Sequence, residues 1–203
     1  MAYTTTGRKR RMRAPERRKQ LLEVARKVFG RRGYHTVTMD AVAREAGVTK
    51  PILYDHFPSK RELYLSLLEA DLATLKERLD DALETSKGNR ERIRGSFQAY
   101  FDFVDEHAEG FRLLMQEAVG SEREFREKVF RFRDDVLDQV TEVIARESKG
   151  NLDRREAADV ALGLIGMVET VAQRDAGASK DQRGKTVDTL VRLAWRGITG
   201  LTL

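Results

Sequence analysis

Residues 38–63, TMDAVAREAGVTKPILYDHFPSKREL, decide the fold of this chain. Their apolar residues recur at spacings of three and four up to Gly47 and again after Thr49, which predicts two short helices. Thr38 and Thr49 suit helix N-caps, and Pro51 falls in a first helical turn, where its missing N–H costs nothing. Two short helices joined by a glycine turn make a helix-turn-helix, whose second helix enters the major groove of DNA.

The second of these helices is expected to have a buried side and a DNA-facing side. Leu53 and Phe57, four residues apart, would pack it against the preceding helix, which we predict over residues 16–32. Ile52 and Tyr54 would face outward, where they suit thymine methyls and the sugar-phosphate backbone. Lys50 is the expected reader of base edges, typically guanine. The predicted DNA-contacting residues are Thr38, Thr49, Lys50, Pro51, Ile52, Tyr54, His56 and Lys60.

Simpler roles stay open for three of these features. Thr49 can cap its helix without touching DNA, although the two roles are compatible. His56 can be an ordinary surface histidine. The basic run at residues 8–13 can lie in a minor groove, or it can be a disordered tail with only non-specific attraction to DNA.

The charge of the chain is divided unevenly along its 203 residues. Residues 1–60 hold 15 lysines and arginines against 5 acidic residues, whereas the remainder holds 23 against 28. A basic first third on an acidic remainder is typical of a nucleic-acid reader carried by a separate body. A solvated basic surface would show the same imbalance, so charge alone does not decide between them.

The rest of the chain also predicts helices. There are only three prolines, and strand signals are confined to residues 34–39. We therefore expect an all-α fold with a basic disordered arm at 1–14, a three-helix domain at 15–60 and a six-helix bundle at 61–203. The further helices are predicted over residues 59–85, 89–106, 110–119, 122–149, 153–175 and 181–199.

Several classes of function are disfavoured by what the sequence lacks. It has no cysteine, which excludes disulfides, thiolate metal sites and cysteine nucleophiles and fits a cytoplasmic protein. No export signal is recognisable, and the longest run of apolar residues and glycine, 160–168, is too short to span a membrane. There are three histidines and no H-E-x-x-H, nucleophile elbow or glycine-rich phosphate loop. We therefore expect a protein that is not an enzyme and uses no cofactor or metal.

Residues 20–70 resemble the DNA-binding domain of the TetR family of bacterial transcription regulators. The most specific part is GVTKPILYDHFPSKREL at residues 47–63, which is close to the family's Gly-Val-Ser/Thr-x-x-x-Leu-Tyr-x-His-Phe-x-x-Lys-x-x-Leu. The resemblance implies that residues 61–203 bind a small ligand and dimerise, so that the homodimer binds palindromic operator DNA. It also places seven residues at the family's DNA-contact positions: Thr38, Thr49, Lys50, Pro51, Tyr54, His56 and Lys60.

Aromatic and aliphatic stripes run through the middle helices of the predicted bundle. Such stripes often form plain core, but the TetR resemblance implies a ligand cavity among these helices. A large apolar lining would favour a long hydrophobic ligand over a sugar or an amino acid. The predicted lining residues are Phe97, Tyr100, Phe101, Val104, Phe111, Leu114, Met115, Phe125, Val129, Phe132, Val136, Leu164 and Val168.

The last two predicted helices are apolar enough to form a four-helix interface with the same pair of a second subunit. They can instead pack within one chain, but the TetR resemblance favours the dimer. The predicted interface residues are Ala161, Ile165, Val168, Val187, Leu190, Val191, Ala194, Trp195 and Ile198.

A narrower resemblance concerns the ligand. The segments FQAYFDFVDEHAEGFRLLMQEA (97–118), ALGLIGMVE (161–169) and RLAWRGI (192–198) resemble actinobacterial TetR-type regulators of fatty-acid synthesis that respond to long-chain acyl-CoA. This resemblance implies a hydrophobic effector, an acyl-CoA, in lipid metabolism. A repressor that responds to drugs and controls efflux, and a DNA-binding dimer without a small ligand, stay open as alternatives. The sequence does not identify a site for the CoA head group.

Overall fold

The computed structural model describes residues 12–107, 122–175 and 177–201, with side chains described up to Gly197. Within these ranges the chain forms eight α-helices and no strand, which confirms the all-α prediction. None of these helices combines the length and hydropathy that crossing a membrane requires. The predicted helix at 110–119 and most of the basic arm lie outside the described residues. The helices are α1 (Ala14–Arg32), α2 (Met39–Glu45), α3 (Lys50–His56), α4 (Lys60–Thr85), α5 (Asn89–Glu106), α7 (Arg123–Glu147), α8 (Arg154–Arg174) and α9 (Lys180–Leu201).

The chain divides into two compact units, the first ending at Leu67. This boundary lies beyond the one predicted after residue 60, because the start of α4 belongs to the core of the first unit. Tyr64 is 1% exposed, and its ring lies 5.2 Å from that of Phe29 and 4.7 Å from that of Tyr34. Three aromatic rings therefore tie α4 to α1 and to the loop before α2.

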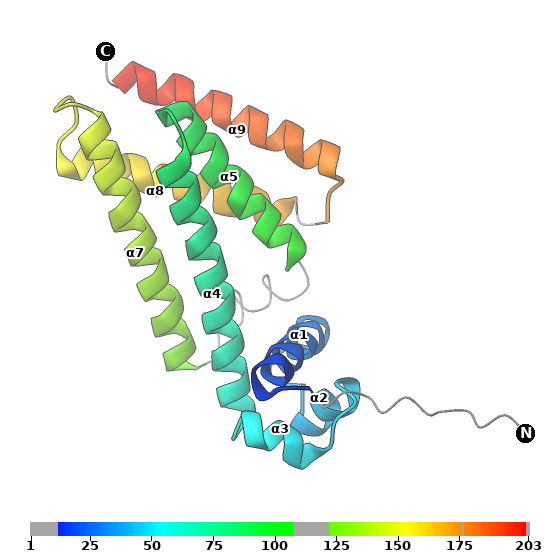
Figure 1. Ribbon diagram of the computed structural model, residues 1–203. Coiled ribbons are helices and arrows are strands. Elements are labelled where there is room, and N and C mark those ends of the chain that lie inside the picture. The colour runs from blue at the N-terminus through cyan, green and yellow to red at the C-terminus, as the bar shows by residue number, and fades with distance from the viewer. Residues whose placement is uncertain (1–11, 108–121, 176, 202–203) are drawn as a thin grey trace, which may run out of the picture. The chain divides into compact units, whose positions relative to one another are not determined.

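The first unit contains the predicted helix-turn-helix, formed by α2 and α3 (Figure 1). Thr38 caps α2, since its hydroxyl oxygen accepts a hydrogen bond of 3.2 Å from the N–H of Ala41. Gly47 forms the turn with a φ of +63°, a conformation that L side chains adopt at a cost. Leu53 and Phe57 are buried, as predicted. The outer side of α3 is thereby left to solvent.

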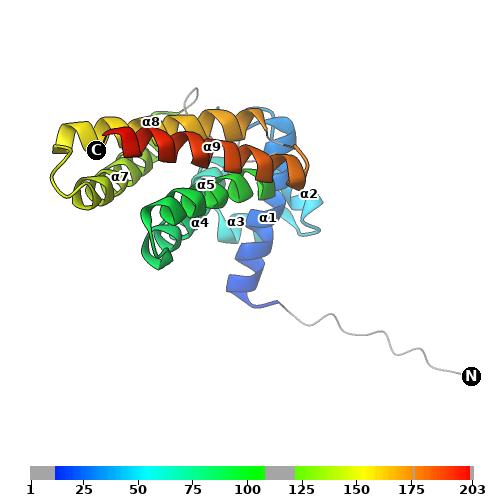
Figure 2. The ribbon, with the colours of Figure 1, turned by 90° about the horizontal axis from the view of Figure 1, so that it is seen from above.

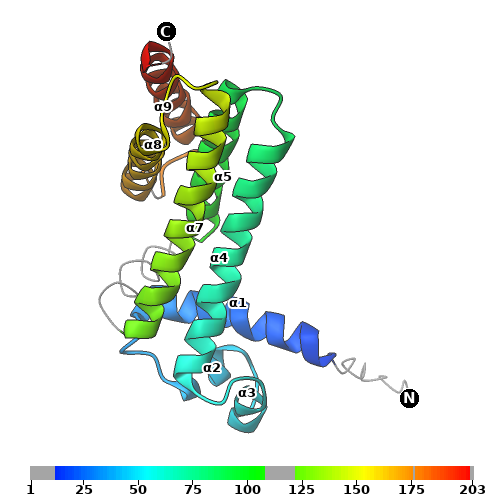
Figure 3. The same ribbon diagram turned by 90° about the vertical axis from the view of Figure 1, so that its left-hand side faces the viewer.

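In the second unit, α4, α5 and α7 run alongside one another, and α8 and α9 lie next to each other against them (Figures 2 and 3). α7 packs mainly on α8, and α5 packs on both α8 and α9. At Gly95 the helices α4 and α5 approach so closely that an added Cβ would lie 3.2 Å from the Cβ of Ala82. The N-terminal half of α5 is thereby held against the end of α4, where one wall of a cavity forms.

Candidate functional site

The outward side of α3 has the exposure that the sequence predicted. Ile52 and Tyr54 are 39% and 38% exposed, although both are large and largely apolar, and Pro51 beside them is exposed as well. Leu53 between them is fully buried. α3 therefore presents an apolar and aromatic surface to solvent while its other side holds it in the domain.

Lys50, the predicted reader of base edges, is held by a residue of α2. Its Nζ lies 2.8 Å from a carboxylate oxygen of Asp40 and 5.9 Å from the centre of the Tyr54 ring. The hydrogen bond to Asp40, and then the negative charge of Asp40, raise the pKa of Lys50 above its ordinary value. Because the ion pair is solvent-exposed, it adds little stability, but it fixes where the ammonium group lies. Asp40 is not among the predicted contact residues, because its ion pair with Lys50 joins two helices and leaves no signal in the residue spacing of either.

The other predicted contact residues differ in whether their polar groups are already hydrogen-bonded within the protein. Lys60 is half-buried and donates to the backbone oxygens of Tyr34 and His35, at 3.0 and 3.4 Å. It therefore ties α4 to the loop before α2, and a phosphate contact from it stays a prediction. Thr49 is exposed and makes no side-chain cap bond, so capping does not occupy its hydroxyl. His56 is half-buried at the end of α3.

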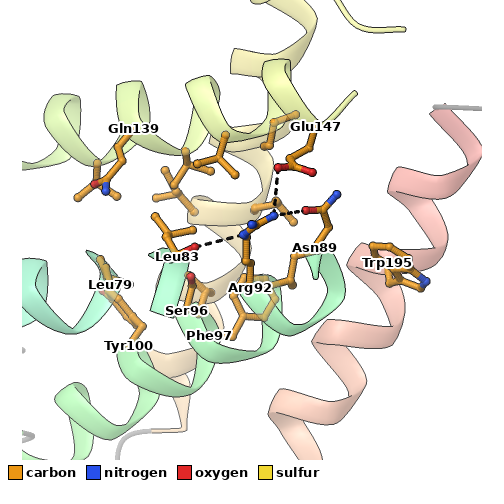
Figure 4. A pocket seen from close by; sticks show the side chains of 18 of the residues that line it. Leu79, Leu83, Asn89, Arg92, Ser96, Phe97, Tyr100, Gln139, Glu147 and Trp195 are labelled. Atoms are coloured by element: carbon orange, nitrogen blue, oxygen red, sulfur yellow. Dashed lines mark hydrogen bonds and ion pairs between the residues drawn. The ribbon is translucent and has the colours of Figure 1, made fainter. Parts of the chain in front are cut away.

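A cavity of about 350 Å³ lies in the second unit among α4, α5, α7 and α8, with Trp195 contributed by α9 (Figure 4). Its walls are mostly apolar, and six of the predicted lining residues are among them: Phe97, Tyr100, Phe132, Val136, Leu164 and Val168. Four others, Phe101, Val104, Phe125 and Val129, are buried but are not part of the lining. The apolar stripe of a helix is wider than the strip that faces the cavity. Phe111, Leu114 and Met115 lie outside the described residues.

The residues predicted for a dimer interface are mostly inside the second unit. Ile165 and Trp195 line the cavity, as Val168 does. Within one chain, five more are buried: Ala161, Val187, Leu190, Val191 and Ala194. The side chain of Ile198 lies outside the described ones. Among the described side chains of α8 and α9, the large apolar ones that are exposed are Leu162 and Leu193, at 59% and 62%. Neither is among the predicted interface residues.

An ion pair lies at each end of the cavity, although helical periodicity did not reveal either. At one end, Arg92 of α5 lies 3.2 Å from Glu147 of α7 and donates to Asn89 at 2.6 Å and to the backbone oxygen of Leu83 at 3.1 Å (Figure 4). At the other end, Arg133 of α7 pairs with Glu169 of α8.

The Tyr100 hydroxyl lies in the wall near the second of these pairs. Burial, and then the charge of Glu169, raise the pKa of Tyr100 well above its ordinary value. The hydroxyl therefore stays protonated at neutral pH. Within the described residues, no group of three or more histidines and carboxylates is arranged to hold a metal ion.

Both units match known proteins. Residues 21–67 match the family described as "Bacterial regulatory proteins, tetR family", and residues 89–197 match "Tetracyclin repressor-like, C-terminal domain". The chain is 36% identical over 192 residues to the HTH-type transcriptional activator FasR of Mycolicibacterium smegmatis, which covers 93% of this chain and 85% of FasR.

Solved structures of regulators share the fold. A TetR-like transcriptional regulator from Rhodococcus sp. RHA1 matches with a TM-score of 0.76 and 30% identity, covering 94% of this chain and all of that one. AibR, solved in complex with isovaleryl coenzyme A and operator DNA, matches with a TM-score of 0.73 and 20% identity over 88% of this chain and 97% of its own. The matches over both units show that this chain is a transcription regulator of the TetR family.

Proposed function

We propose that the chain is a homodimeric regulator whose operator affinity is controlled by a long-chain fatty acyl-CoA bound in the cavity of the second unit. The observation that carries this proposal is the cavity itself. Its volume of about 350 Å³ lies within the range of small-molecule sites, and its lining is apolar with a few polar groups.

The length of the cavity favours an extended ligand. Its lining follows α7 from Phe132 to Glu147, and α7 places Arg133 and Glu147 roughly 21 Å apart along its axis. That distance is about the length of an extended long-chain acyl group. A wall of leucine, isoleucine, valine and phenylalanine between two polar ends suits such a chain better than a compact polar metabolite. AibR, which shares this fold, was solved with isovaleryl coenzyme A, so the fold can accommodate an acyl-coenzyme A.

Trp195 allows a direct test, because it is the only tryptophan of the chain and it lines the cavity. We expect palmitoyl-CoA to change the intrinsic fluorescence of the protein saturably, at concentrations that also change its operator affinity in gel-shift titrations. Coenzyme A without an acyl chain, the matched control, should do neither. If operator affinity stays unchanged at a palmitoyl-CoA concentration that saturates the fluorescence change, the ligand does not control DNA binding.

Dimerisation is the second part of the proposal. One short recognition helix reads too few bases for operator specificity, and a dimer places two of them on neighbouring half-sites. The exposed Leu162 of α8 and Leu193 of α9 lie on two helices that run next to each other (Figure 2). Large exposed leucines on adjacent helices suit an isologous interface. The test is the molecular mass of the protein in solution, since a mass equal to that of one 23.2 kDa chain would contradict the dimer.

On the DNA side, we propose that Asp40 positions Lys50 for base reading. Replacing Asp40 by asparagine frees the lysine, which should then contact a phosphate. We expect weaker discrimination at one base pair of each half-site, and a salt dependence steeper by about one phosphate contact per subunit. Binding titrations over a salt series, with operator and scrambled DNA, measure both effects.

Asp55→Asn is the matched control for this experiment. Asp55 is likewise exposed and acidic but lies on α3, so its replacement removes the same charge from the domain without breaking the ion pair of Lys50. If both substitutions change specificity equally, Asp40 acts only through the overall charge of the domain.

A further inference from the structure

The two ends of the cavity differ in charge. At the Arg133 end, one arginine is paired with one carboxylate, so the charged pair in the lining is neutral. At the Arg92 end, the lining contains Arg92 and Glu147, and also Lys149 in the turn after α7. The charged side chains that line this end therefore carry one excess positive charge.

Arg92 is held in place without using all of its hydrogen-bond donors. Its Nε donates to the backbone oxygen of Leu83 and its Nη1 to Asn89, while the ion pair with Glu147 also uses Nη1. Within the described part of the chain, these contacts leave the N–H groups of Nη2 for another acceptor. The side chain is 20% exposed, so a group entering from solvent can reach it. The remaining Nη2 of this charged guanidinium can donate a charge-assisted hydrogen bond to an oxygen of a carboxylate or phosphate.

The backbone at Lys149 also suggests that this end of the cavity binds a ligand. Lys149 has a φ of +53° and is the only residue other than glycine in the described chain with a positive φ. This left-handed conformation is unfavourable for a lysine, and it occurs in a residue that lines the cavity and is exposed.

We infer that the Arg92 end of the cavity, with Arg92 and Lys149, binds the anionic head of the ligand, and that the neutral Arg133 end receives the tail. This inference rests on the proposed function. The shared chemistry is an anionic group on a long apolar chain, which a free fatty acid supplies as a carboxylate and an acyl-CoA supplies as phosphates beyond a thioester. Arg92 would contact the carboxylate of a fatty acid or the nearest phosphate of an acyl-CoA, whereas the exposed Lys149 would contact phosphates farther from the chain.

Three probes with the same tail test this inference: palmitoyl-CoA, palmitate and uncharged methyl palmitate. Affinities are read from the fluorescence of Trp195, which all variants retain. Arg92→Gln should weaken binding of both anionic probes about tenfold and leave methyl palmitate unchanged. Lys149→Gln should weaken binding of palmitoyl-CoA alone. Arg131→Gln is the matched control, since Arg131 is exposed on α7 outside the lining.

The outcomes separate this inference from the proposed function. If the wild type binds none of the probes, the ligand assignment fails and the head-group site falls with it. If the wild type binds palmitoyl-CoA but Arg92→Gln weakens all probes equally, or none, only the head-group site is wrong. Because Arg92→Gln leaves Glu147 without its partner, Arg92→Gln/Glu147→Gln repeats the test with neutral amides at both positions. This pair should show the same selective loss for anionic probes.

Discussion

Replacing Tyr54 by alanine is expected to lower operator affinity on the order of 100-fold while leaving the protein folded. Tyr54 is 38% exposed on the outward side of α3, so its removal opens no cavity in the core. A lost contact between a side chain and DNA weakens binding about tenfold, and a dimer loses the contact twice. Gel-shift titration gives the affinity, and a thermal melt shows whether the fold is intact.

Two neighbouring substitutions show what the loss means. Tyr54→Phe removes only the hydroxyl. An operator affinity between those of the wild type and Tyr54→Ala would assign part of the effect to a hydrogen bond between this hydroxyl and a phosphate. Leu53→Ala truncates a fully buried side chain and should destabilise the first unit by about 2–5 kcal/mol. If Tyr54→Ala keeps full operator affinity, Tyr54 is not a DNA contact. The same holds if the variant loses affinity only because it no longer shows a cooperative thermal melt and is therefore unfolded.

The helix-turn-helix could be predicted because its determinants are local. Gly47 for the turn, Thr38 for the cap and Pro51 in the first turn of α3 each act within a few residues, and the structure places each of them as expected. The ion pair between Lys50 and Asp40 was not predicted, because it joins different helices across the turn. The role of Lys60 depends on a loop far away in sequence, whose carbonyl oxygens it reaches.

The cavity could be predicted only in part, for a related reason. Helical periodicity identifies which side of a helix is buried, and Phe97, Tyr100 and Phe132 were found in this way. It does not indicate which buried residues face empty space, so Phe125 was assigned to a cavity that it does not line. The polar ends arise from residues on different helices, such as Arg92 and Glu147, and no spacing within one helix brings them together.

Val140→Phe should make the regulator insensitive to long-chain acyl-CoA. Val140 lines the cavity on α7, midway along the chain between Arg133 and Glu147. A phenyl ring there would exclude about four methylenes of an extended tail, which removes about 3 kcal/mol of hydrophobic stabilisation and lowers affinity on the order of 100-fold. The ring fills space that is empty without ligand, so the melting temperature should stay the same or rise. The measurement is operator affinity with and without palmitoyl-CoA.

Acyl-CoA ligands of different acyl-chain length make this experiment decisive. Because Val140 lies midway, a tail that ends before it avoids the ring whichever end of the cavity holds the head group. Hexanoyl-CoA should therefore bind Val140→Phe as it binds the wild type, whereas palmitoyl-CoA should not. Leu137→Phe, which adds the same ring to α7 outside the lining, should leave both affinities unchanged. A Val140→Phe protein that still responds fully to palmitoyl-CoA would mean that the tail does not run along α7, and the cavity would then not be the effector site.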